Sequence, residues 1–201
     1  MIRILLADDQ HLVRGALAAL LALEEDFEVV AEVADGFAAV AAAADREADV
    51  ALLDIEMPGL DGIAATARIR EVAPAVRVLI LTTFGRPGYL RRAMDAGARG
   101  FVVKDAPAAR LALAIREVHR GGTVVDPALA VASLSTGASP LTERERDVLR
   151  AGRDGATVAE IAARLVLSEG TVRNYLSSAI GKTGARNRTE AALIAHDRGW
   201  L

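Results

Sequence analysis

The feature that most constrains the fold is a fivefold alternation of short apolar runs with longer stretches rich in alanine and leucine. This alternation is typical of repeated βα units, which build a parallel sheet covered by helices. The apolar runs are nearly continuous, as in strands that are buried on both faces. We therefore expect an α/β doubly wound, five-stranded parallel sheet over residues 1–120. Its strands are predicted at Ile2–Ala7, Phe27–Val33, Val50–Leu53, Val78–Leu81 and Gly100–Val103, and its helices near 11–23, 36–46, 61–72, 87–96 and 107–119.

The strand pattern ends after Gly121-Gly122, and residues 121–139 are rich in small residues, serine, glycine and proline. This composition predicts a linker, with Asp126-Pro127 as the signal for one short helix within it. Residues 140–201 contain the helix-start pattern of a cap residue three positions before a glutamate, at Thr142, Thr157 and Asn187. A fourth helix is predicted to begin at Ser168. Four short helices, two of them joined by a brief turn, predict an all-α helix-turn-helix domain.

The two predicted domains differ in charge. Residues 1–138 hold 14 basic and 19 acidic residues, whereas residues 139–201 hold 10 basic and 8 acidic ones. The stretch from Gly170 to Arg188 carries four basic residues and no acidic one, as expected for a surface that meets an anionic partner. No apolar stretch is long enough to span a bilayer or to act as a signal segment, and cysteine is absent. We expect a cytoplasmic protein without membrane insertion.

Polar residues follow the predicted strands at the ends where parallel strands place their ligand sites. Asp8 and Asp9 end the first strand and Asp54 the third, while Thr82-Thr83 end the fourth and Lys104 the fifth. Three carboxylates suit Mg²⁺, and an ammonium with a hydroxyl suits a phosphoryl group beside it. Each residue alone has a structural explanation, as a cap, a turn or a strand residue. The joint placement at strand ends is what favours a phosphoryl site.

The scarcity of lysine bears on the same site. Only two of the 24 basic residues are lysine, Lys104 and Lys182. A compact ammonium fits a tight phosphate pocket where the wider guanidinium of arginine does not. Both lysines are therefore candidate phosphate contacts, although a strong arginine bias could leave two lysines by chance.

The strand-end residues, with Met57-Pro58-Gly59, Asp61-Gly62 and Phe101-Val-Val-Lys104, resemble the receiver domain of two-component response regulators. The resemblance implies flavodoxin-like strand order and Asp54 as the phosphoryl acceptor. It also implies Mg²⁺ held by Asp9, Asp54 and the main-chain carbonyl of Glu56, with Asp8 assisting through water. Thr82 and Lys104 would bind phosphoryl oxygens. Phe101 matches the aromatic that turns inward on phosphorylation, although a core aromatic on a strand would look the same.

The helix from Ser168 is the predicted recognition helix, which would lie in the DNA major groove. Arg173 and Asn174 can read guanine and adenine, with Glu169 and Ser177 on the same face. Lys182, Arg186 and Arg188 would hold phosphates. For Arg173 and Asn174 a solvated helix face is the alternative.

The segments Leu141–Leu149, Glu160–Ala162, Leu165–Ser168 and Thr171–Arg173 resemble the LuxR-type DNA-binding domain. With the receiver in front, the chain resembles a NarL/FixJ-type regulator. Val158-Ala159 and Thr183 depart from the residues usual in that family, which puts backbone contacts from the second helix in doubt. In that family the last helix, here about 188–198, often pairs two subunits on DNA.

The resemblance implies a transcription regulator rather than an enzyme, although one that accepts a phosphoryl group and can promote its own phosphorylation and dephosphorylation. Its expected partners are a sensor histidine kinase, double-stranded DNA and a second copy after phosphorylation, with RNA polymerase as a further candidate. The stretch from Leu81 to Tyr89 resembles the subgroup named for DesR, a regulator of membrane-lipid desaturation. Two alternatives stay open: a phosphorylation-independent regulator, and a Mg²⁺-dependent phosphohydrolase that uses Asp54 as nucleophile.

Overall fold

The structure is a computed structural model that describes residues 1–45, 47–83, 87–127, 129–131 and 139–201. The chain divides into two compact units, one formed mainly by residues 1–131 and the other mainly by residues 132–201. Of the predicted features, residue 46, the centre of the Leu81–Tyr89 stretch (84–86) and linker residues 128 and 132–138 lie outside the described residues. Each unit is described below by itself.

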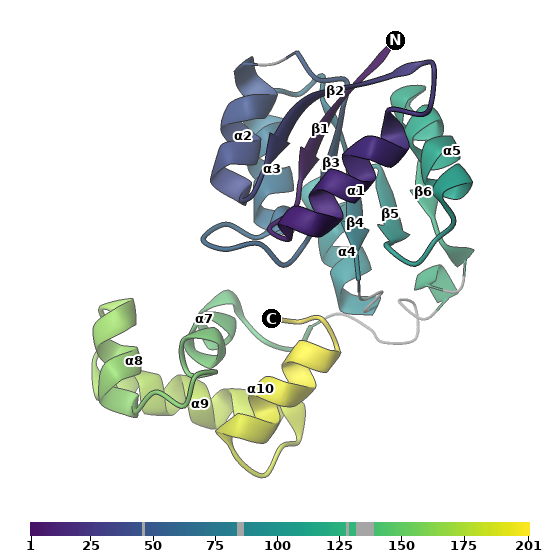
Figure 1. The fold of residues 1–201 in the computed structure, drawn as a ribbon. Helices are drawn as coiled ribbons and strands as arrows, with labels where there is room; N and C mark the ends of the chain where they lie inside the picture. Colours follow the sequence, from purple (N-terminus) through teal and green to yellow (C-terminus); the bar gives the residue numbers. More distant parts are fainter. Residues whose placement is uncertain (46, 84–86, 128, 132–138) are drawn as a thin grey trace. The chain divides into compact units, whose positions relative to one another are not determined.

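The first unit is a parallel sheet with the strand order β2-β1-β3-β4-β5-β6, shown in Figure 1. This order confirms the predicted doubly wound sheet. The strands are β1 (Ile2–Ala7), β2 (Phe27–Val33), β3 (Val50–Leu53), β4 (Arg77–Thr82), β5 (Gly100–Val103) and β6 (Val124–Val125). The helices are α1 (His11–Leu21), α2 (Gly36–Asp45), α3 (Gly62–Val72), α4 (Pro87–Ala96) and α5 (Ala108–His119).

The two faces of the sheet are both covered, as the continuous apolar strands predicted. One face packs alternate strand residues such as Ile4, Leu52 and Leu79 against apolar residues of α5, including Ile115, and of α1. Every residue of β3 is buried, which explains why its sequence has no polar alternation. Because strand residues alternate in direction, Phe101 faces the side opposite Val102, which belongs to that first cluster.

The sixth strand lies in the stretch predicted as linker. The two residues of β6 pair with β5, Val124 with Gly100 and Val125 with Phe101, and the Val124 amide donates to the Arg99 carbonyl at 2.9 Å. The three β-branched residues between Gly122 and Asp126, of which Val124 and Val125 form β6, are too short a run to predict a strand. The two valines become one because β5 would otherwise end the sheet with unpaired backbone groups.

The second unit contains α7 (Glu143–Ala151), α8 (Val158–Leu165), α9 (Glu169–Thr183) and α10 (Arg188–Asp197). Thr142 and Thr157 form complete capping boxes, and Ser168 and Asn187 accept from the backbone amides of Thr171 and Glu190. All four predicted helix starts are therefore confirmed. Between α8 and α9 the chain turns at Val166, which has a left-handed backbone with φ 55°. The four helices share one apolar core that includes Val148, Ile161, Val172 and Trp200.

Within the described part of the chain, no helix combines the length and the apolar character that crossing a bilayer requires.

Candidate phosphoryl-transfer site and DNA-binding helix

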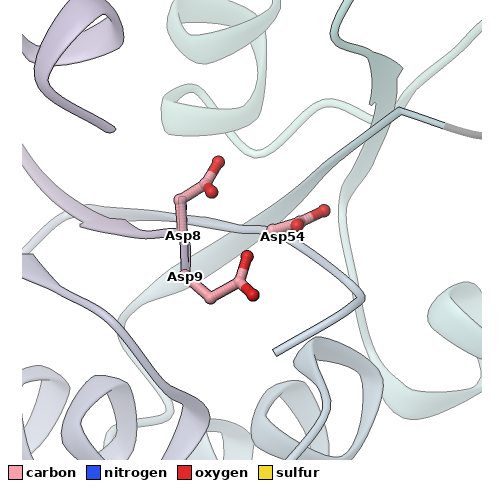
Figure 2. Close-up of side chains that lie close together, drawn as sticks. All are labelled: Asp8, Asp9 and Asp54. Atoms are coloured by element: carbon pink, nitrogen blue, oxygen red, sulfur yellow. The ribbon is translucent and has the colours of Figure 1, made fainter. Parts of the chain in front are cut away.

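Three predicted carboxylates meet at the carboxyl ends of β1 and β3. Asp8, Asp9 and Asp54 each offer an oxygen, and these oxygens lie within 4.8 Å of one another. Figure 2 shows the three side chains converging from the two strand ends. Asp8 is 1% and Asp54 3% exposed, whereas Asp9 is open to solvent. The fit to a hard divalent cation is good, because such an ion takes carboxylate oxygens and keeps several waters on its open side.

The Lys104 ammonium lies between the two buried carboxylates, 2.7 Å from Oδ2 of Asp8 and 3.1 Å from Oδ2 of Asp54. Its side chain is only 11% exposed. Burial raises the pKa of Asp54 above its usual range, and the adjacent Lys104 ammonium opposes that shift. The lysine therefore favours the ionised form of Asp54 and offsets part of the effect of burial.

Local backbone geometry holds the two buried carboxylates in place. Oδ1 of Asp8 accepts from the Gln10 amide at 2.9 Å, and Oδ1 of Asp54 accepts from the Ile55 amide at 2.8 Å. Each carboxylate thus points its other oxygen at Lys104. Gly62 lies so close that an added Cβ would stand 1.9 Å from the Asp54 carbonyl oxygen, so only glycine fits at this start of α3.

The remaining predicted site residues lie on β4, β5 and the loop after β3. Thr82 is the last residue of β4 and is 2% exposed, while Thr83, the next residue, is exposed. The Lys104 amide donates to the Thr82 carbonyl at 2.8 Å, which ties the two strand ends together. Phe101 is fully buried on β5. Glu56 is exposed, two residues after Asp54.

The predicted DNA-contacting residues are on α9 and at the start of α10. Arg173, Asn174 and Ser177 are exposed on α9, so their side chains are accessible for base contacts. Arg173 pairs with Glu169 one turn earlier, at 2.5 Å. Arg186 pairs with Glu190 at 3.0 Å.

Two of the predicted phosphate contacts also make contacts inside the unit. Arg188 donates to the Ala156 carbonyl at 2.8 Å. The Lys182 ammonium lies 2.8 Å from Oε2 of Glu145, a carboxylate that is 3% exposed. Lys182 is thus part of an ion pair that joins α9 to α7.

Glu145 is a structural residue that the sequence reasoning treated only as half of a capping box. Its oxygens also accept from the Thr142 amide at 2.7 Å and from the Ser178 hydroxyl at 2.7 Å. Burial alone would raise the pKa of Glu145, but the hydrogen bonds from Lys182, Ser178 and Thr142 outweigh it and hold the pKa at about 2. The local sequence carries no signal for this pairing, because Glu145 and Lys182 lie 37 positions apart on different helices.

Comparison with known proteins identifies both units. Residues 4–116 match the family described as response regulator receiver domain, and residues 139–195 match the luxR family of bacterial regulatory proteins. The chain is 44% identical over 201 residues to the uncharacterized transcriptional regulatory protein YvfU of Bacillus subtilis, with full coverage of both chains. It is 43% identical over 201 residues, again with full coverage of both, to the transcriptional regulatory protein DesR of the same organism.

A solved structure of the response regulator RcsB bound to DNA is also similar. It is 26% identical, has a TM-score of 0.65 and covers 98% of each chain. The matches to the two families together cover the greater part of the chain, and the relatives cover all of it. The chain therefore belongs to the two-component response regulators of the NarL/FixJ type, transcription regulators with a receiver domain followed by a LuxR-type DNA-binding domain.

Proposed function

We propose that Asp54 is the phosphoryl acceptor of this regulator and that a sensor histidine kinase is the donor. The observation that carries the proposal is the Lys104 ammonium held between the buried carboxylates of Asp8 and Asp54. An Asp54 oxygen would form a bond to phosphorus while the bond from phosphorus to the kinase imidazole breaks. A small phosphodonor could replace the kinase, since the residues that assist transfer are all in the receiver.

Mg²⁺ is the cofactor we propose for this step. Asp9, Asp54 and the Glu56 main-chain carbonyl would hold it, and Asp8 would assist through water. The bound ion would supply positive charge beside the transferred group. Lys104 would bind one phosphoryl oxygen through its ammonium and Thr82 another through its hydroxyl. Both residues stand at strand ends, so rigid elements set the position of each group.

The phosphorylated site would then change the receiver through β4 and β5. A phosphoryl group adds about −1.5 to −2 charge next to Asp54. We propose that Thr82 moves toward it, that the Phe101 ring, already buried in this structure, repacks behind Thr82, and that α4 and β5 shift with them. A changed receiver surface would favour dimerisation.

Dimers would present two copies of α9 to two DNA half-sites, with α10 of each subunit available for pairing. Arg173, Asn174 and Ser177 would contact bases, while Lys182, Arg186 and Arg188 would contact phosphates. Lys182 would contact a DNA phosphate and keep its ion pair with Glu145. RNA polymerase is a candidate further partner, because the regulator acts on transcription.

We also propose the domain boundaries 1–120, 121–139 and 140–201, and a place of action in the cytoplasm. The two family matches, at residues 4–116 and 139–195, lie within the proposed domains apart from one residue.

The place of action follows from the two proposed partners. A regulator that binds chromosomal DNA and receives phosphate from a kinase would meet the DNA and the kinase in the cytoplasm.

The test compares the wild-type chain with Asp54→Asn, each treated with a small phosphodonor and Mg²⁺. We expect phosphate labelling, dimerisation and tighter DNA binding in the wild type, and none of the three in the variant. Unchanged labelling of Asp54→Asn would refute the assignment. Dimerisation and DNA binding that do not respond to phosphorylation would support the phosphorylation-independent alternative.

A further inference from the structure

A polar cavity lies in the receiver at the amino-terminal ends of the strands, whereas Asp54 follows the carboxyl end of β3. It has a volume of about 300 Å³ and is lined by the amino-terminal ends of β4 and of the segment before β5, together with the end of α3. Three arginines line it: Arg70 in the last turn of α3, Arg77 as the first residue of β4, and Arg99 directly before β5. The phosphorylation residues Thr82 and Lys104 follow the other ends of the same two strands.

The charge of this cavity is not balanced by the protein. No acidic residue is among the described residues that line it. None of the three arginines has a carboxylate within ion-pair distance in the described part of the chain. Other arginines of the receiver do have one, as Arg116 has in Glu24, Arg3 in Glu47 and Arg110 in Asp126. Arg70 and Arg99 are exposed and Arg77 is half-buried, so water and salt screen part of the repulsion among them, and an anion between them would reduce it further.

The backbone around the cavity is well anchored. The Arg77 amide donates to the Asp49 carbonyl at 3.0 Å, and the Arg99 amide donates to the Val78 carbonyl at 2.7 Å. Thr66, on the cavity wall, is fully buried, and its hydroxyl already donates to the Gly62 carbonyl. Hydrogen bonds therefore fix the backbone of the cavity wall, and the three arginine side chains extend from it with Arg70 and Arg99 exposed and Arg77 half-buried.

Gly97 has no side chain and so leaves room for the side chain of Arg70. It has a positive φ of 109°, and an added Cβ would lie 2.9 Å from Cδ and 3.2 Å from Nη1 of Arg70. The Arg70 side chain thus lies across the bare backbone of Gly97, at the wall of the cavity. Any larger residue at 97 would push the guanidinium away.

We propose that this cavity binds a small phosphate-bearing anion. Guanidinium forks match phosphate oxygens in pairs, and two or three of them balance a phosphate dianion better than a single carboxylate. The volume exceeds that of a bare phosphate and is at the lower end of the range for small-molecule sites. Pro74, Ala75 and Val76 add an apolar wall against which an organic portion can pack.

This site is independent of phosphorylation. The two lie at opposite ends of β4 and β5, so a ligand in the cavity does not contact Asp54. An anion there would join the α3–β4 turn to the α4–β5 turn and stabilise the receiver by mass action.

The test is calorimetric titration of the full chain with inorganic phosphate, diphosphate and adenosine monophosphate, each at constant ionic strength and without Mg²⁺. We expect saturable one-to-one binding of at least one probe, with a dissociation constant of about 1 mM or tighter. The Asp54→Asn variant should bind equally well, which separates this site from the phosphorylation site. Arg77→Gln combined with Arg99→Gln should weaken binding about tenfold or more, because each removes charge-assisted hydrogen bonds.

The matched control is Arg120→Gln, an exposed arginine after α5 whose replacement should leave binding unchanged. Circular dichroism of each variant shows that the fold is kept. The proposal is overturned if no probe binds saturably, or if the double variant binds as tightly as the wild type. It is equally overturned if only duplex DNA binds in a way that depends on Arg77 and Arg99, since the cavity would then belong to the DNA interface.

Discussion

At the scale of single residues, Lys104 carries the most information. Its ammonium is the only described cation placed within ion-pair distance of both Asp8 and Asp54. Its side chain is only 11% exposed, and carboxylate oxygens lie 2.7 and 3.1 Å from the ammonium. A guanidinium at this position would have to displace one carboxylate or turn toward solvent. The residue type, and not only its charge, therefore follows from the geometry.

The prediction for this residue is that Lys104→Arg folds but responds poorly to phosphorylation. A misplacement of about 1 Å in a transfer site reduces the rate roughly hundredfold, so we expect phosphate labelling to slow by about that factor. The matched control is Arg120→Lys, the reverse exchange at an exposed position. Labelling kinetics and phosphorylation-induced dimerisation measure the effect. Full inducibility of Lys104→Arg would contradict the argument from side-chain shape.

The convergence of these side chains was predictable because parallel strands place their carboxyl ends at one edge. Residues as far apart as Asp8 and Lys104 could be assigned to one place without any contact being known. The local sequence did not predict that Lys182 pairs with Glu145, because Glu145 is on another helix, and helix-to-helix register is not written in local patterns. Nor did the sequence predict the cavity lined by Arg70, Arg77 and Arg99. These residues meet only because the α3–β4 and α4–β5 turns lie side by side in the fold.

At the scale of elements, the ion pair of Glu145 and Lys182 joins the first and third helices of the DNA-binding domain. Glu145 also completes the capping box of α7, so one carboxylate both starts a helix and fixes its neighbour. The predicted linker also contains a strand, because Val124 and Val125 pair with β5 and extend the sheet. Short elements of this kind depend on tertiary pairing, which explains why two valines predicted nothing by themselves.

The prediction at this scale concerns acid stability. The pKa of Glu145 is about 2 in the folded chain, against 4.5 ordinarily, so the folded state favours the ionised form. The resulting stability is present above pH 4.5 and is lost as the pH falls toward 2. A shift of this size corresponds to roughly 3 kcal/mol. Glu145→Gln should therefore destabilise the domain near neutral pH and lose its disadvantage in acid.

Urea unfolding followed by fluorescence measures this effect within one domain, because the only tryptophan, Trp200, is buried in the core of the four helices. The free energy of unfolding of wild type and variant should differ at pH 7, and the difference should shrink as the pH falls from 4.5 toward 2. Glu143→Gln, an exposed exchange at the first position of the same helix, is the matched control and should show little difference. A gap between Glu145→Gln and wild type that stays constant with pH would exclude the ion pair as its source.

At the scale of the whole molecule, charge separates the two functions. The receiver and linker carry an acidic excess, while the DNA-binding domain carries a basic one, with cations on all four of its helices. Most of these cations already have a carboxylate neighbour, as Arg173 has in Glu169 and Arg186 has in Glu190. DNA phosphates would have to compete with those neighbours. The affinity for DNA should therefore be moderate for one subunit, which makes it responsive to dimerisation.

The last prediction separates base contacts from phosphate contacts in the phosphorylated dimer. Arg186→Gln should weaken binding to all DNA sequences and reduce the salt slope by about 1 per subunit, because one phosphate contact is lost. Asn174→Ala should instead reduce discrimination between the operator and altered sites by about 1–3 kcal/mol and leave the salt slope unchanged. Arg144→Gln, on α7, is the control and should alter neither quantity. Binding isotherms at several salt concentrations provide both measurements, and a salt slope that falls for Asn174→Ala but not for Arg186→Gln would reverse the assigned roles. The distinction holds because a phosphate contact acts through released counterions, whereas a base contact acts through hydrogen bonds that only the correct base completes.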